Sequence, residues 1–77
     1  MNHSEFLRHL DGVIEAAPGT LKGDEILAEL SAWDSLAVLS FIAMVDDKFK
    51  VQLSGKDIAA CQSLADLARL LGDRITP

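Results

Sequence analysis

The stretch AWDSLAVLSFIAMVDDKF, residues 32–49, decides the fold of this chain, because it combines a helix start with a long apolar run. Asp34 is a favoured N-cap, since its carboxylate can accept hydrogen bonds from backbone N–H groups that have no partner inside the helix. We therefore expect Ser35 in the first turn, with its hydroxyl facing solvent at the positive end of the helix dipole. A phosphate-linked group would suit that position. An ordinary capped helix could also begin with Asp-Ser.

The residues after Ser35 predict a helix that runs to about Lys50 and buries one face. The core stripe consists of residues at helical spacing, widened by two neighbours: Leu39, Ile42, Val45 and Phe49, with Val38 and Phe41. Four positions near the serine are instead expected to be exposed: Leu36, Ala37, Ser40 and Met44.

Two further amphipathic segments flank this helix. Ser4 is expected to cap a first helix that runs to about Ala16 and ends at Pro18-Gly19. Its core face gathers Phe6, Leu10, Val13, Ile14 and Ala17, whereas the charged side chains Glu5, Arg8, Asp11 and Glu15 fall elsewhere. Ser63 is expected to begin the last helix in a capping box with Asp66. The last helix closes the core through Leu64, Leu67, Ala68, Leu71 and Ile75.

The segment from Pro18 to Trp33 has no sustained period and predicts a long loop with one helical turn around Glu25 to Ala28. Its apolar anchors are Leu21, Ile26, Leu27, Leu30 and Trp33. Trp33 either pins the end of the loop against the helices or offers a contact surface to partners. Further on, Val51-Gln52-Leu53 is expected to be an extended connector, followed by a short helix from about Lys56 to Cys61 with Ile58 facing inward.

Length and composition limit the possible functions. The 77 residues allow one small domain, and 49% apolar residues indicate a packed core. Seven basic and twelve acidic residues give a net charge of −5, which argues against nucleic acid and anionic membranes as partners and favours a basic patch on another protein. The single cysteine, the polar start and the lack of a long apolar stretch favour a soluble cytoplasmic protein without membrane insertion.

Catalytic and metal-binding constellations are not evident in the sequence. Nucleophilic catalysis needs a base within reach of the nucleophile, and both histidines, His3 and His9, fall in or before the first helix. Cys61 is expected to be a small buried hydrophobe, with a reactive thiol as the alternative. The acidic pairs Asp24-Glu25 and Asp46-Asp47 are expected on the solvated surface. We therefore expect neither an enzyme nor a metal site.

The motif Asp34-Ser35-Leu36 lies in a recognisable order of elements: an amphipathic first helix, a long first loop, the apolar run ending at Phe49, Val51-x-Leu53, a short helix near Ile58, and Ser63-Leu64 opening a last helix. In motif, length and element order the chain resembles the acyl carrier protein family. The resemblance implies an all-α fold for residues 1–77: a small four-helix bundle in which helices two and four pack against helix one, and the short third helix bridges one end. The starting Met1 and compact ends favour a stand-alone carrier, and we expect it to be a monomer.

The resemblance also implies a function. Ser35 would carry 4′-phosphopantetheine, placed there by a phosphopantetheinyl transferase, while Asp34 helps to position the motif. The arm would hold acyl groups as thioesters and present them to acyl-loading and acyl-transferring enzymes. The third helix would border an acyl pocket at Ile58 and Ala59, although Ile58 could equally be plain core. The expected partner surface comprises Trp33, Leu36, Ala37, Ser40, Met44, Asp46 and Asp47.

Some positions depart from the pattern of fatty-acid carriers. Ala37 and Ser40 stand where acidic residues are common in that family, Ala32 replaces a usual glycine, and Trp33 directly precedes Asp34. These departures favour a specialised pathway that makes a polyketide, a lipopeptide or a modified surface sugar or lipid, over housekeeping fatty acid biosynthesis. An aminoacyl or peptidyl carrier is an alternative, although Trp33 stands where that family usually has glycine. The alternative of another class is an unmodified helical adaptor that uses Asp34-Ser35 only as a cap.

Overall fold

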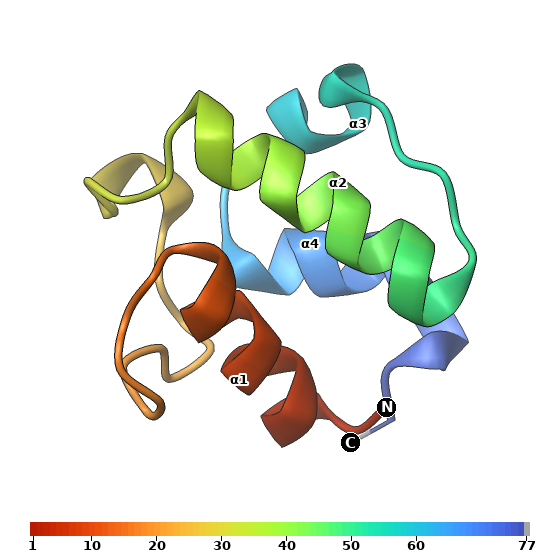
Figure 1. Ribbon diagram of the computed structural model, residues 1–77, viewed down its shortest axis with the longest axis horizontal. Helices are drawn as coiled ribbons and strands as arrows, with labels where there is room; N and C mark the ends of the chain where they lie inside the picture. The colour runs from red at the N-terminus through yellow and green to blue at the C-terminus, as the bar shows by residue number, and fades with distance from the viewer. Residues whose placement is uncertain (77) are drawn as a thin grey trace.

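The computed structural model describes residues 1–76; Pro77, the last residue of the expected domain, lies outside the described residues. Four α-helices follow one another in the order α1 (His3–Val13), α2 (Ser35–Phe49), α3 (Gly55–Ala59) and α4 (Leu64–Leu71) (Figure 1). Two 3₁₀ turns, η1 (Leu27–Glu29) and η2 (Gly72–Arg74), complete the regular structure. The prediction of a small all-α protein with a long first loop is confirmed.

Helix α1 begins two residues before the sequence-based prediction. Asn2, not Ser4, is the N-cap: its side chain accepts the N–H of Glu5 at 2.8 Å, and the Glu5 carboxylate accepts the N–H of Asn2 at 3.2 Å. This reciprocal pair satisfies two donors that the helix leaves free. The helix ends at Val13 rather than near Ala16, because Glu15 adopts a left-handed conformation with φ of 58°. Ala17 lies beyond that break and is exposed instead of facing the core.

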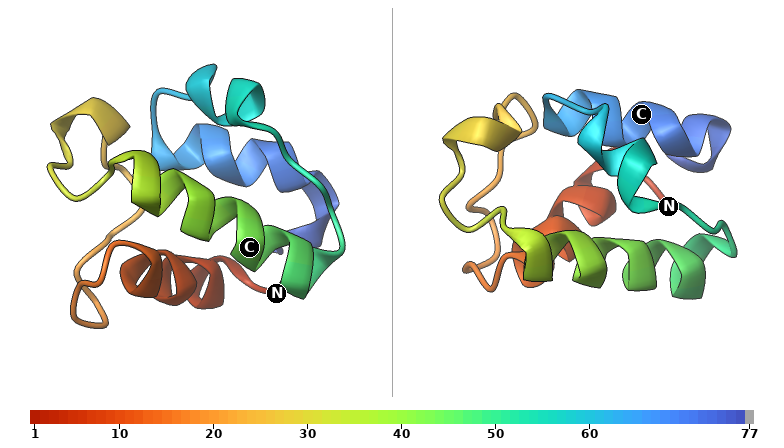
Figure 2. Two further views of the ribbon diagram at one scale, coloured as in Figure 1. Left: turned by 45° about the horizontal axis from the view of Figure 1, so that its top comes forward. Right: turned by 90° about the horizontal axis from the view of Figure 1, so that it is seen from above.

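The core forms where α1, α2 and α4 face one another (Figure 2), with additional residues from the first loop and α3. Phe6 and Phe41 lie at its centre, both 0% exposed, with ring centroids 6.2 Å apart in an edge-to-face arrangement. The other buried apolar residues of the cluster are Leu7, Leu10, Leu21, Leu27, Val45, Ile58, Leu64, Leu67 and Leu71.

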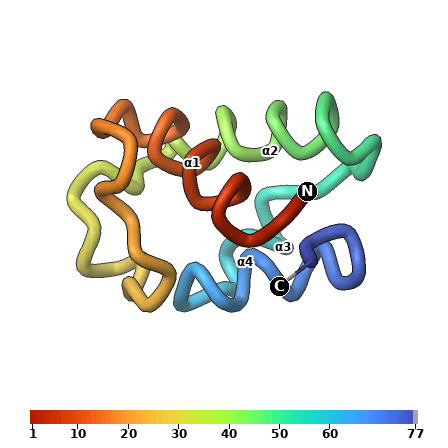
Figure 3. The backbone as a smooth tube through the Cα atoms, turned by 90° about the horizontal axis from the view of Figure 1, so that it is seen from below, coloured from red at the N-terminus to blue at the C-terminus, as the bar shows by residue number. Residues whose placement is uncertain are grey.

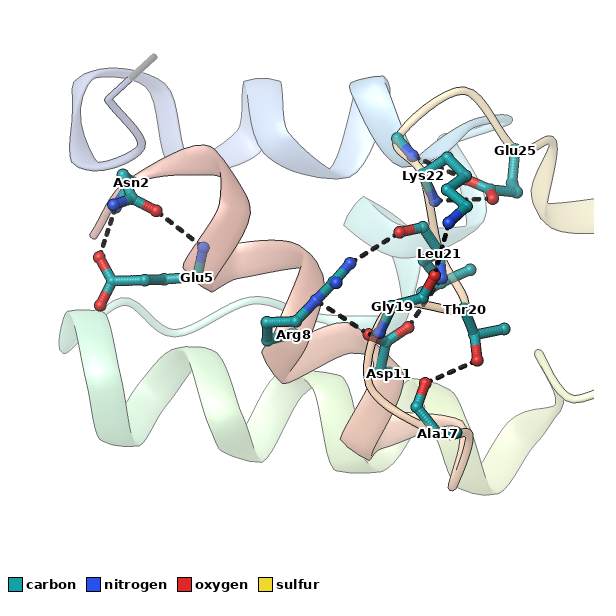
Figure 4. A network of polar contacts seen from close by, with 11 residues as sticks. Asn2, Glu5, Arg8, Asp11, Ala17, Gly19, Thr20, Leu21, Lys22 and Glu25 are labelled. Atoms are coloured by element: carbon teal, nitrogen blue, oxygen red, sulfur yellow. Dashed lines mark hydrogen bonds and ion pairs between the residues drawn. The ribbon is translucent and has the colours of Figure 1, made fainter.

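A buried carboxylate holds the first loop against α1. Asp11 is 1% exposed, although its charge predicted a place away from the core. Its two oxygens accept the N–H groups of Gly19 and Leu21, each at 2.9 Å, and Arg8 Nε lies 3.0 Å from one of them (Figure 4). Arg8 also donates to the Leu21 carbonyl at 2.7 Å. The charge of Asp11 is buried because the loop backbone supplies its partners.

Backbone pairing joins distant segments at two further places. The N–H of Leu27 donates to the Gln62 carbonyl at 2.9 Å, and the N–H of Leu64 donates to the Glu25 carbonyl at 3.1 Å. These two hydrogen bonds connect the first loop to the start of α4. The N–H of His3 donates to the Thr76 carbonyl at 2.8 Å. The two ends of the chain therefore lie side by side, far from the start of α2 (Figure 3).

The last two helices follow the predicted order with small shifts. Helix α3 begins at Gly55, capped by Ser54, and ends at Ala59, two residues before Cys61. Ser63 caps α4 as predicted, but the Asp66 carboxylate accepts the N–H of Gln62 at 2.9 Å rather than that of Ser63. Within the described part of the chain, no helix is long and apolar enough to cross a membrane.

Candidate functional site

The start of α2 has the local geometry that the sequence predicts. Asp34 is the N-cap in an extended conformation, and its Oδ1 accepts the N–H of Ala37 at 2.9 Å. The Asp34 carbonyl accepts the N–H of Val38 at 3.0 Å, which closes the first turn. Ser35 is the first residue of α2 and is exposed. The cap therefore fixes the backbone on which an accessible hydroxyl is carried.

Two backbone donors remain free beside this hydroxyl. Among residues 1–76, no acceptor hydrogen-bonds to the N–H groups of Ser35 and Leu36. The first turn of α2 carries no acidic side chain besides the cap. Free N–H groups and the positive end of the helix dipole stabilise an anion. An ester phosphate on the Ser35 oxygen thus fits the residues present.

Trp33 lies directly before the cap and is half-buried. Its ring packs edge-on against Phe41, with centroids 5.9 Å apart and planes at 67°. This is the contact expected of a loop anchor. Trp33 also lines a cavity, so part of the indole surface remains available to a ligand.

That cavity, of about 320 Å³, lies between the first loop, α2 and α3. Most of its wall is apolar, and it is lined by Leu27, Ala28, Leu30, Trp33, Val38, Gly55, Ile58, Ala59 and Cys61. Ile58 is 3% exposed and so contributes both to the core and to the cavity wall, while Ala59 is exposed at the cavity's edge. The two positions expected at an acyl pocket therefore border one cavity.

Cys61 forms part of the same wall and is half-buried, in partial agreement with the expected buried cysteine. Its Sγ donates to the Asp57 carbonyl at 3.4 Å. Burial, together with the negative charges of Asp66 and Asp57, raises the pKa of the thiol above its ordinary value of 9.0. Cys61 is therefore protonated at neutral pH and is a weak nucleophile.

The faces of α2 differ from the predicted ones. Ala37, expected on the surface, is 3% exposed, because it lies one turn before Phe41 on the side that packs against the core. Leu39, expected in the core, is 64% exposed. The buried stripe is Ala37, Phe41 and Val45, with Ile42 and Phe49 half-buried beside it.

The remaining predicted contact residues are distributed along the helix. Leu36 and Ser40 are exposed within one and a half turns of Ser35, whereas Met44 is half-buried. Asp46 and Asp47 are exposed, but Asp46 lies eleven positions after Ser35, a distance of about 17 Å along the helix axis. These two acidic residues therefore do not lie beside the serine.

Another hollow, on the outer side of α2, has no counterpart in the sequence-based predictions. Its volume is about 350 Å³, and it is lined by Leu39, Ile42, Ala43, Asp46, Gln52 and Leu53. Two chain segments form it, the outward face of α2 and the extended connector that follows. Residues 1–76 contain no group of three potential metal ligands among their His, Cys, Asp and Glu side chains.

Comparison with known proteins adds one finding. Residues 5–71 match the model of the phosphopantetheine attachment site family. The match covers all four helices except the first two residues of α1. Neither a curated protein nor a solved structure matches the chain.

Proposed function

Because the chain belongs to the phosphopantetheine attachment site family, whose prosthetic group is 4′-phosphopantetheine, we propose that Ser35 is the residue that carries this group. The protein is accordingly a carrier, and the chemistry of its cargo is performed by the enzymes that it meets. When bound, the group supplies a terminal thiol that holds an acyl chain as a thioester. Ser35 supplies the hydroxyl for attachment, and Asp34 holds the turn that exposes it.

The observation that carries this proposal is the first turn of α2. An exposed hydroxyl, two free N–H groups and a cap bonded to Ala37 at 2.9 Å coincide at one helix start. The cap leaves the donors nearest the hydroxyl without a partner, where a phosphodiester would be stabilised. An ordinary cap requires the Asp34 contact but has no need for an exposed serine at the next position.

Intact-protein mass spectrometry tests the assignment. The apo protein is incubated with coenzyme A, Mg²⁺ and a broad-specificity phosphopantetheinyl transferase, beside Ser35→Ala and the control Ser31→Ala, which removes an exposed hydroxyl of the preceding loop. We expect the wild type and Ser31→Ala to gain the mass of one phosphopantetheine, and Ser35→Ala to gain none. Loading of Ser35→Ala would refute the assignment, and failure of the wild type with several transferases would favour the unmodified adaptor.

The cavity behind Trp33 supports a second part of the proposal, that the acyl chain is sheltered against the bundle. Its apolar wall from α2, α3 and the first loop suits a hydrocarbon chain, with Ile58 and Ala59 on the α3 side. Trp33 is the only tryptophan, so its fluorescence reports on the cavity. We expect octanoyl loading to shift the Trp33 emission relative to the unacylated form, and Ala59→Phe, which fills the cavity, to reduce that shift.

The surface of α2 supports a specialised pathway rather than housekeeping fatty acid synthesis. Ser40, which is exposed, stands where fatty-acid carriers commonly have an acidic residue, and Ala37, at another such position, is buried and uncharged. We propose that the acyl-loading and acyl-transferring partners of this chain belong to a pathway such as polyketide, lipopeptide or surface-sugar modification. Acyl thioesters bound to the protein after purification from its native host would identify the cargo.

A further inference from the structure

A groove lies between the end of α1 and the start of α2, which are neighbours in the fold (Figure 2). Its volume is about 410 Å³. The residues that carry the argument below are Val13, Ile14 and Glu15 at the end of α1, and Asp34, Leu36 and Ser40 around the start of α2. We call this surface the α1–α2 groove. It shares no lining residue with the cavity behind Trp33, so the two hollows are separate surfaces.

The α1–α2 groove adjoins the proposed attachment residue. Asp34 and Leu36, the residues directly before and after Ser35, both line it. Ser40, which also lines it, lies five positions after Ser35, about 7.5 Å further along the helix axis. Any group joined to the Ser35 oxygen therefore begins at the edge of this groove.

The polar side chains of the groove are hydrogen-bond acceptors. Glu15 and Asp34 supply carboxylates, and Ser40 supplies a hydroxyl. Glu15 is exposed, and its carboxylate takes no part in the ion pairs within residues 1–76. Asp34 caps α2 through Oδ1, so its other oxygen can accept a further hydrogen bond. The groove therefore suits a ligand that carries uncharged N–H and O–H donors.

The conformation of Glu15 is a second sign that its side chain has a use. Its φ of 58° lies in the left-handed region, where glycine is free of strain. A residue that only ended α1 would therefore be more favourable as glycine. Strained residues of this kind are frequent in binding sites, where the side chain is needed.

The 4′-phosphopantetheine arm has the complementary chemistry. Beyond its phosphate the arm is uncharged, and it carries a hydroxyl and amide N–H groups as donors, together with a pair of methyl groups on one carbon. Carboxylates accept hydrogen bonds from such donors strongly. The methyl groups match the apolar part of the groove, where Val13 and Ile14 are half-buried and Leu36 is 67% exposed. The mostly apolar wall of the cavity behind Trp33 would leave the donors without partners.

We propose that, in the unacylated form, the uncharged part of the 4′-phosphopantetheine arm lies in the α1–α2 groove, with its donors bonded to Glu15 and Asp34 and its methyl groups against Val13 and Ile14. The inference rests on the proposed attachment at Ser35. The phosphodiester stays at the start of α2, where the free N–H groups stabilise an anion. With the arm in this place, the cavity behind Trp33 stays open for an acyl chain.

Isotope-filtered nuclear Overhauser (NOE) spectroscopy tests the proposal. The apo protein, uniformly labelled with carbon-13, is loaded by a broad-specificity transferase from unlabelled coenzyme A and kept reduced, and its mass confirms loading. The filter then selects contacts between the unlabelled arm and the labelled protein. We expect NOEs from the methyl protons of the arm to the methyl groups of Val13 and Ile14. These residues lie more than twenty positions before Ser35, so attachment to the neighbouring chain does not by itself produce such contacts.

Matched variants test the part played by Glu15. Glu15→Gly removes the carboxylate and relieves the strain, and it should weaken the NOEs to Val13 and Ile14 at least about twofold. Glu15→Gln keeps an acceptor oxygen and should give stronger NOEs than Glu15→Gly. The control Glu29→Ala removes an exposed carboxylate that does not line the groove, and its NOEs should equal those of the wild type. Circular dichroism checks that each variant is folded.

Three results would overturn the proposal. A loaded protein whose arm gives no NOE to Val13 and Ile14, or contacts Ile58 in the other cavity instead, would show that the arm does not occupy this groove. NOEs that are unchanged in Glu15→Gly would show that the carboxylate does not bind the arm. Absence of loading in the wild type would overturn the attachment at Ser35 and this inference together, and the mass measurement distinguishes that result because no product forms at all.

Discussion

Replacement of the buried carboxylate tests how the long first loop is held. Asp11→Ala removes the acceptor of two backbone N–H groups, those of Gly19 and Leu21, each bonded at 2.9 Å. Hydrogen bonds to a charged group contribute about 1.5–3 kcal/mol each. The ion pair with Arg8 adds at most about 1 kcal/mol, because the Arg8 side chain is 43% exposed and solvent screens it.

The two backbone bonds set the size of the expected effect. The N–H of Gly19 is only partly buried and can bond to water in the variant. The loss in the free energy of unfolding should therefore be close to twice the lower value for one bond, about 3 kcal/mol. A domain of 77 residues has a free energy of unfolding of about 4–12 kcal/mol. Asp11→Ala should therefore remove a quarter or more of the stability. Asp11→Asn keeps one acceptor oxygen and should cost about half as much.

Urea unfolding followed by far-ultraviolet circular dichroism measures these differences. The control is Asp24→Ala, which removes an exposed carboxylate of the same loop and should change the free energy of unfolding by less than about 0.5 kcal/mol. An Asp11→Ala variant within about 1 kcal/mol of the wild type, at an unchanged m-value, would refute this account of the loop. The loop would then be held by its apolar anchors and by its other hydrogen bonds, those from Arg8 to Leu21 and from Leu27 to Gln62 among them.

Three further predictions concern single residues. Lys50 is the C-cap of α2 in the left-handed conformation, with φ of 59°, which is strained for a residue with a side chain. Lys50→Gly should therefore raise the free energy of unfolding by about 0.5–1 kcal/mol in the same urea assay, and a lower free energy of unfolding would contradict this strain. Burial alone would raise the pKa of Glu25, but hydrogen bonds from backbone N–H groups, those of Lys22 and Gly23 among them, lower it below the ordinary value of 4.5. This contribution to stability is present above pH 4.5 and lost as the pH falls through the lowered pKa, so thermal unfolding of Glu25→Gln should depend less on pH in that range. Cys61, whose pKa is raised by burial and nearby carboxylates, should react with iodoacetamide at pH 7 far more slowly in the folded protein than in urea, as mass spectrometry would show.

The helix starts could be predicted from the sequence, because capping is local. Asp34 and Ser63 each bond an N–H group three residues further along, and their residue types already indicate that contact. The position of Ser35 at the head of α2 follows from the same local chemistry. Asn2 was missed because Asn2 and Ser4 are both favoured caps, and only the reciprocal bonds with Glu5 distinguish them.

The burial of Asp11 could not be predicted, because its cause lies outside its own helix. A charge between Leu10 and Gly12 predicts an exposed position, and only the return of the loop brings two backbone donors to the carboxylate. Gly19 and Leu21 lie eight and ten residues after Asp11, beyond the end of α1, so the spacing of residues within the helix does not reveal these bonds. Polar pairing of this kind becomes visible only when the path of the loop is known.

The exposed face of α2 was missed for a physical reason. A helical pattern shows which side is buried only when polar residues mark the other side, and residues 35–45 contain no charge to mark it. Leu39 and Ala37 were therefore exchanged between core and surface. Leu36 and Leu39 are exposed at positions where charged residues would have marked the outer side of the helix. The absence of charge thus accounts for both errors, because a stretch of apolar and small residues gives the periodicity nothing by which to separate one face of the helix from the other.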